Sequence, residues 1–184
     1  EEQVTYYEKF WKSYSVEASE ILVKELKPVI GRLSRYIRGG EHKSVCEIGS
    51  GRGGFLQALK ESGFNVIGTE PSELLFLKAK KYYGFHEGEL LNLPGHEFCV
   101  YLNGKGKKVG SFILWHVLEH MNDPMSMLQK LVELLDVNGT ILFQLPILSK
   151  EQLFPEHLMF FTKSTAKYIE CEFGLKMVFS EKDY

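Results

Sequence analysis

One glycine-rich segment constrains the fold of this chain more than any other. Residues 45–55 read VCEIGSGRGGF, an apolar run that is followed at once by closely spaced glycines. The apolar run predicts a buried β-strand, and the glycines allow a tight turn that larger side chains would obstruct. A helix that begins directly after such a turn presents free N–H groups to a ligand. The segment therefore predicts a strand–loop–helix unit that binds a small molecule at the loop.

The rest of the chain alternates short apolar runs with longer helical patterns, which is typical of βαβ units and a parallel sheet. We therefore expect an α/β fold with a Rossmann-like, doubly wound and mostly parallel sheet. The predicted strands are Ser44–Ile48, Asn65–Thr69, Phe85–Gly88, Gly110–Trp115, Thr140–Gln144 and Leu175–Phe179. The predicted helices are Gly53–Ser62, Ser72–Tyr82, Pro124–Leu135 and Lys163–Phe173.

Two regions fit this alternation less well. Residues 94–110 combine an apolar run with a glycine-lysine turn, and they predict a small hairpin rather than a helix. Residues 3–38 carry aromatic side chains and then an amphipathic helical pattern, in which Pro28 predicts a kink or a break. We expect residues 1–40 to form a helical segment that covers the ligand site as a lid, lines the substrate site or packs into the core. Residues 41–184 are then the binding domain.

Composition and charge narrow the range of partners. The formal net charge of −2 provides no general field that would gather nucleic acid. No apolar run reaches the roughly 20 residues that span a bilayer, and we expect no signal peptide from this N-terminal sequence. Cys46, Cys99 and Cys171 are expected to be buried reduced thiols, which are typical of a cytoplasmic protein. The oligomeric state stays open.

The acid at position 47 decides between two kinds of ligand for the glycine loop. Gly49, Gly51 and Gly54 satisfy G-x-G-x-x-G, a pattern of loops that bind the pyrophosphate of a dinucleotide. A carboxylate two residues before the first glycine would repel a pyrophosphate, whereas it would attract a ligand with an ammonium group. The loop resembles motif I of the class I S-adenosylmethionine (SAM) dependent methyltransferases. Their (E/D)-x-G-x-G-x-G pattern is met in full by Glu47, Gly49, Gly51 and Gly53.

A second acid, Glu70, follows the second predicted strand. A carboxylate at this position can accept hydrogen bonds from both hydroxyls of a ribose, as in other nucleotide-binding α/β folds. Glu70 also fits a simpler role as a charge at the start of a helix that Ser72 caps. Both roles are compatible, and neither separates SAM from NAD, because both nucleotides carry a ribose.

Three later segments resemble the same family. Residues 111–124 (SFILWHVLEHMNDP) resemble a segment of a subgroup that includes ubiquinone-pathway O-methyltransferases and sugar C-methyltransferases. Residues 138–146 (NGTILFQLP) and 156–162 (EHLMFFT) resemble two further segments of that subgroup, in the same order. The resemblance covers roughly residues 40–180 and implies a seven-stranded sheet. Because the chain ends after the sixth predicted strand, we expect the seventh strand to be missing from it.

The resemblance also implies a set of residues that contact SAM. Glu89 is expected to accept a hydrogen bond from the adenine amino group, with Leu90 packed on the ring, although Glu89 also reads as an exposed loop residue. The whole predicted set consists of Glu47, Gly49, Ser50, Gly51, Gly53, Glu70, Pro71, Glu89, Leu90, Trp115 and His116.

The candidate catalytic residues are three histidines and an acid. His116, His120 and His157 are each able to serve as a general base near neutral pH, and Glu119 is able to orient one of them. His120 also fits a purely structural role. His116, Glu119 and His120 spell H-x-x-E-H, the pattern of a zinc peptidase, but that motif requires a continuous helix and these residues directly follow a predicted strand.

A metal is compatible with these positions but has no further support in the sequence. In the ubiquinone-pathway enzymes the matching positions resemble a carboxylate, carboxylate and histidine set linked to a divalent ion. Here His116 replaces the first acid. The sequence therefore assigns no metal site.

These patterns together predict a SAM-dependent methyltransferase that acts on an O, C or N nucleophile of a small-molecule acceptor and releases S-adenosylhomocysteine (SAH). Two alternatives remain open: an NAD(P)-dependent oxidoreductase that uses the same loop, and a catalytically inert scaffold that binds SAM. The identity of the acceptor is not encoded in any motif.

Overall fold

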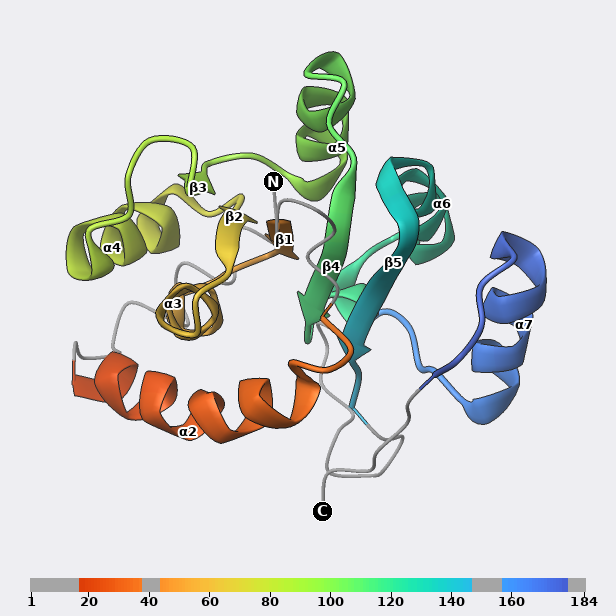
Figure 1. The fold of residues 1–184 in the computed structure, drawn as a ribbon, viewed down its shortest axis with the longest axis horizontal. Coiled ribbons are helices and arrows are strands. Elements are labelled where there is room, and N and C mark those ends of the chain that lie inside the picture. Colours follow the sequence, from red (N-terminus) through yellow and green to blue (C-terminus); the bar gives the residue numbers. More distant parts are fainter. Residues whose placement is uncertain (1–16, 38–43, 147–156, 179–184) are drawn as a thin grey trace.

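Five parallel strands form the centre of the molecule (Figure 1). The computed structural model describes residues 17–37, 44–146 and 157–178. The strands are β1 (Ser44–Ile48), β2 (Asn65–Thr69), β3 (Leu90–Leu91), β4 (Val109–Trp115) and β5 (Leu135–Gln144), in the order β3-β2-β1-β4-β5. The strand order reverses between β1 and β4, and open α/β sheets bind ligands at the carboxyl ends of the strands beside such a reversal.

Helices cover both faces of this sheet. Successive residues of a strand point to opposite faces, so each strand contributes side chains to two separate buried clusters. Val45 and Ile113 belong to one buried cluster, whereas their neighbours Cys46 and Phe112 belong to another. The first cluster is completed by α2 (Glu17–Leu33), α3 (Gly54–Glu61) and α4 (Glu73–Tyr83). The second is completed by α5 (Gly95–Gly104), α6 (Pro124–Leu134) and α7 (Lys163–Phe173).

The predicted α/β fold with a parallel sheet is confirmed. The predicted bounds of β1, β2 and α7 are those of the structure. Strand β4 and helix α6 differ from prediction by one residue at one end, and α3 and α4 differ by one residue at each end. Strand β5 ends at Gln144 as predicted, but it begins at Leu135 and not at Thr140. Several of these elements carry a run of buried residues or a clear cap. The side chain of Asp123, for example, accepts the Ser126 N–H at 2.9 Å at the start of α6.

The third strand was expected too early in the chain. Residues 85–88 form no strand, and β3 is only Leu90–Leu91. Phe85 is buried, but it fills the core beside α3 and α4 directly after α4 has ended at Gly84. The chain then turns, with the Glu89 N–H donated to the His86 carbonyl. The apolar residue Phe85 is therefore buried in a loop and does not mark a strand.

The hairpin expected within residues 94–110 is wrong, because Gly95–Gly104 is the helix α5. Its buried residues Phe98, Cys99 and Leu102 recur at the spacing of one helical face, and they pack against α6 and the sheet. The glycine-lysine sequence that suggested a hairpin lies at the end of this helix and in the turn to β4.

Three further expectations need correction or limits. Residues 175–178 are not a strand, and residue 179 lies outside the described part of the chain. Helix α2 continues through Pro28 as far as Leu33, so Pro28 does not break it. Cys171 is exposed, although Cys46 and Cys99 are buried as expected.

The predicted lid falls only partly within the described residues. Leu26, Ile30 and Leu33 of α2 are buried in the cluster that includes β1 and α3. The aromatic residues at positions 6–14 lie outside the described residues, so the lid stays a prediction. Among the residues that the structure places, no helix has the length and apolar character needed to cross a bilayer.

Candidate functional site

The glycine loop joins the carboxyl end of β1 to α3 in a conformation that requires glycine. Gly49 and Gly53 have φ values of +71° and +77°, in the left-handed region that side chains disfavour. A Cβ on Gly49 would lie 2.9 Å from a methyl group of Val117, and one on Gly53 would lie 2.9 Å from the Phe85 ring. Gly53 precedes α3 and has no side chain, so no side chain caps the start of that helix.

Glu47 lies at the end of β1 as a buried carboxylate. It is only 2% exposed, and burial raises its pKa from 4.5 to about 8. The nearby Ser50 hydroxyl and the Leu56 N–H lower the pKa in part, while the charge of Glu70 raises it further. Among the described residues, Oε2 of Glu47 has no hydrogen-bond partner. A cationic ligand group would satisfy this oxygen and favour the ionised form.

The buried state of Glu47 makes the stability of the ligand-free protein depend on pH. Because the pKa rises on folding, the folded state binds more protons than the unfolded state between pH 4.5 and about 8. We expect the free energy of unfolding to fall as pH rises through this window, by at most about 1.4 kcal/mol per pH unit for one proton. Urea unfolding at several pH values would measure this slope in the wild type and in Glu47→Gln.

The slope should be shallower in Glu47→Gln. Some slope should remain, because burial also raises the pKa of Glu70, which gives a contribution of the same sign. Equal slopes in the two proteins would contradict the raised pKa of the buried Glu47.

Glu70 joins the glycine loop to the start of α4. Its Oε2 accepts the Gly51 N–H at 2.7 Å, and its Oε1 accepts the Ser72 N–H at 2.8 Å. Ser72 caps α4 by accepting the Leu75 N–H, so Glu70 fulfils the structural role expected for it at a helix start. Each carboxylate oxygen can accept more than one hydrogen bond, so ribose hydroxyls remain possible partners of Glu70.

Glu89 has different surroundings from those expected. Its carboxylate pairs with Lys60 at 2.7 Å and accepts the His86 N–H at 2.7 Å. It precedes β3, whereas Leu90 is buried within that strand. The structure does not place Glu89 after the third strand, so its role and that of Leu90 beside adenine stay predictions.

Asn92 is the residue that follows β3 at the carboxyl edge of the sheet, and the sequence patterns did not indicate it. Its side-chain amide donates to the Glu70 carbonyl at 2.8 Å and to the Pro71 carbonyl at 3.2 Å. It was missed because the apolar residue Phe85 places the predicted strand too early. The proline that follows at position 94, just before α5, is the only local signal that the strand ends nearby.

Trp115 and His116 lie at the carboxyl end of β4, the strand next to β1 in the sheet. Trp115 packs on Phe55 of α3, with ring centroids 4.7 Å apart. His116 has a φ of +54°, which is unusual for a residue other than glycine, and its N–H donates to the Gln144 carbonyl at the end of β5. Such backbone strain is typical of functional positions.

The structure brings the four candidate catalytic residues together. Nδ1 of His116 lies 3.1 Å from Oε1 of the fully buried Glu119, and Nε2 of His120 lies 4.0 Å from the same oxygen. The ring centroids of His120 and His157 are 5.0 Å apart. A continuous helix is absent, because only the three-residue 3₁₀ helix η1 (Leu118–His120) follows β4. The zinc peptidase alternative is therefore wrong.

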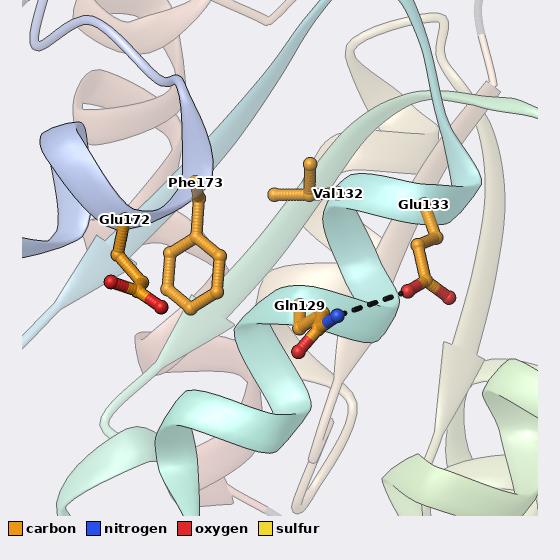
Figure 2. Close-up of a pocket in the computed structure, with 5 residues that line it drawn as sticks. All are labelled: Gln129, Val132, Glu133, Glu172 and Phe173. Carbon is orange, nitrogen blue, oxygen red and sulfur yellow. Dashed lines mark hydrogen bonds between the residues drawn. The ribbon is translucent and has the colours of Figure 1, made fainter.

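A separate groove lies between α6 and α7 (Figure 2). It has a volume of about 250 Å³ and is lined by Gln129, Val132, Glu133, Glu172 and Phe173. Figure 2 shows that Gln129 and Glu133 hydrogen-bond to each other along α6, at 3.4 Å. The groove contains none of the predicted site residues and no grouping of catalytic side chains, so we assign it no ligand.

Comparison with known proteins adds a family match and a likeness in fold. Residues 18–176 match a family model described as a methyltransferase domain. An uncharacterized methyltransferase from Bacillus pumilus (strain SAFR-032) is 34% identical over 96 residues. That alignment covers 50% of this chain and 37% of the relative, so the chain matches well under half the length of that relative.

Two solved structures have a similar fold. A SAM-dependent methyltransferase from Archaeoglobus fulgidus superposes with a TM-score of 0.62 at 21% identity, over 84% of this chain and 69% of that one. Magnesium protoporphyrin IX methyltransferase from Synechocystis PCC 6803, solved with bound SAH, gives a TM-score of 0.58 at 17% identity. That match covers 83% of this chain and 71% of the other.

Proposed function

This chain belongs to the methyltransferase domain family, and on that premise we propose that it transfers a methyl group from SAM to a small-molecule acceptor. We propose that the methyl group is transferred to an O, C or N atom of the acceptor and that SAH is released as the second product. The single observation that carries it is the buried Glu47 with an unpartnered oxygen beside the glycine loop.

Each part of SAM has a suitable partner in this arrangement. The ammonium group of its amino-acid portion would pair with Glu47 and so offset the cost of burying that carboxylate. Its ribose hydroxyls would donate to Glu70, and its adenine would lie near Asn92 at the carboxyl edge of β3. NAD offers no ammonium group, and its pyrophosphate would face a carboxylate, so Glu47 favours SAM over NAD.

Methyl transfer is an in-line displacement. A lone pair of the acceptor attacks the methyl carbon, the carbon–sulfur bond breaks, and the sulfonium becomes the neutral thioether of SAH. The leaving group needs no protonation, so the protein chiefly aligns the two reactants and excludes water. A hydroxyl or amine acceptor also loses a proton, and a nearby base assists this loss.

His116 is the best-placed base. Its Nδ1 faces the buried Glu119 at 3.1 Å, so in the tautomer that donates to this carboxylate Nε2 is the proton acceptor. Its side chain is 48% exposed, which leaves it accessible to an acceptor. His120 is less exposed, at 19%, and contacts Glu119 less closely. Glu119 therefore acts as a positioning residue for His116.

Calorimetric titration with SAM, SAH and NAD tests the proposed cofactor. We expect SAM and SAH to bind and NAD not to bind. Because the pKa of Glu47 is about 8 without ligand, most of this group is protonated at pH 7, and pairing with an ammonium should release close to one proton. Titrations in buffers of different ionisation enthalpy would measure that proton. Binding of NAD without binding of SAM would refute the proposal.

A second assay separates an enzyme from an inert scaffold. The protein would be incubated with radiolabelled SAM and a panel of phenols, amines and carbon acids, and label in the acceptor would be counted. Transfer that falls by about 100-fold in His116→Gln would support the assigned base. Tight SAM binding without transfer to any acceptor would favour the scaffold.

A further inference from the structure

Three side chains beside the proposed site converge on one point from two separate segments. Glu119 and His120 belong to η1, whereas His157 lies before α7. One potential ligand atom from each of the three residues lies within 4.8 Å of the other two. A shift of about 1 Å in side-chain position would bring these atoms to the spacing they adopt around one metal ion.

Backbone hydrogen bonds hold the two segments together. The carbonyl of Glu119 accepts the N–H groups of Leu158 and Met159, at 2.7 Å and 3.2 Å. The N–H of His120 donates to the Val117 carbonyl at 3.1 Å, which fixes the turn of η1. His157 is therefore placed next to His120 by the chain fold itself, and the two rings contact each other with centroids 5.0 Å apart.

The buried Glu119 carboxylate is a second observation that favours a cation beside it. Its side chain is fully buried, and Oε1 contacts His116. Its other oxygen, Oε2, is buried and has no hydrogen-bond partner among the residues that the structure describes. A buried carboxylate with an unsatisfied oxygen is costly unless a cation or a donor meets it.

We propose that Glu119, His120 and His157 bind a divalent transition-metal ion of the Zn²⁺ type. Two imidazole nitrogens and one carboxylate oxygen suit zinc, cobalt or iron(II), whereas magnesium and calcium prefer ligand sets made of oxygen alone. The contact with His116 orients the Glu119 carboxylate in the way that hydrogen-bonded neighbours orient metal ligands. Three protein ligands leave at least one coordination position open for water or an acceptor oxygen.

This site goes beyond the proposed methyl transfer and does not depend on it. An ion here would lie close to His116, and it would lower the pKa of an acceptor hydroxyl bound to it. The sequence pattern alone could not assign the site, because His157 reaches Glu119 and His120 only through the fold.

Cobalt titration of the full chain tests the site directly. The protein would be freed of any histidine tag and of EDTA after chelation, and CoCl2 would then be added while visible absorption is recorded. We expect one equivalent of Co²⁺ to give saturable ligand-field bands that ZnCl2 displaces. His120→Gln and His157→Gln should each weaken binding on the order of 100-fold. His96→Gln, at an exposed position on α5, should bind as the wild type does.

Circular dichroism would verify that each variant remains folded. A wild type without saturable bands would overturn the proposal, as would folded His120→Gln and His157→Gln variants that bind cobalt as tightly as the wild type. Calorimetry with SAM on the chelated protein keeps the two proposals distinct. SAM binding without metal binding would refute only the metal site, whereas metal binding without SAM binding would refute only the proposed function.

Discussion

Replacing Glu47 with glutamine is expected to weaken SAM binding by about 100-fold, while the ligand-free protein becomes more stable at pH 8. The loss corresponds to roughly 3 kcal/mol, the scale of a buried charged pair from which one partner is removed. The gain in stability arises because glutamine carries no charge to bury, whereas Glu47 must lose its proton near pH 8. Calorimetry would measure the first effect and urea unfolding at pH 8 the second.

The opposite signs of these two effects make the test specific. A mutation that merely damaged the fold would lower both affinity and stability. Glu97→Gln is a matched control, because this glutamate has an exposed side chain on α5 and should change neither quantity measurably. Unchanged SAM affinity in Glu47→Gln would remove the main support for the proposed cofactor.

Replacing Gly53 with alanine is expected to destabilise the protein by about 3 kcal/mol and to abolish ligand binding at the loop. Holding an L-residue at a φ of +77° costs about 1–2 kcal/mol. The new Cβ would also lie 2.9 Å from the Phe85 ring and 3.0 Å from the Ala79 Cβ, which adds an overpacking cost of about 1–3 kcal/mol. Urea unfolding would give the loss of stability.

Gly84→Ala separates these two contributions. Gly84 ends α4 with a φ of +65°, but a Cβ there would have no atom within 4 Å. It should therefore cost only the conformational term, about 1–2 kcal/mol, and leave SAM binding intact. Equal losses in Gly53→Ala and Gly84→Ala would show that close packing of the loop against α4 and Phe85 contributes nothing.

The central strands and most helices could be predicted because burial and periodicity agree there. In β4 the residues from Val109 to Leu114 are all buried, and in α7 a Thr162 cap and Gly174 mark the two ends. Prediction failed at Phe85, where a buried residue lies outside any helix or strand. It also failed in α5, where β-branched and glycine residues made a helix look like a hairpin. A single apolar residue cannot indicate whether it lies in a strand or a loop.

The geometry of the candidate site was predictable where one continuous motif carries it. The glycine loop directly follows Glu47 in the chain, and the His116–Glu119 contact joins residues of one short segment. Asn92 was not predictable, because it depended on the position of β3. No motif predicted the approach of His157 to His120, since sequence does not specify a distance between segments so far apart.

The two hydrogen bonds that Glu70 accepts from Gly51 and Ser72 have a kinetic consequence. They fix the position of this carboxylate in advance, so under the proposed function the ribose of SAM would meet an acceptor that is already oriented and needs no slow rearrangement there. Association at this end of the ligand should follow simple one-step kinetics, and any slower phase would originate elsewhere in the pocket.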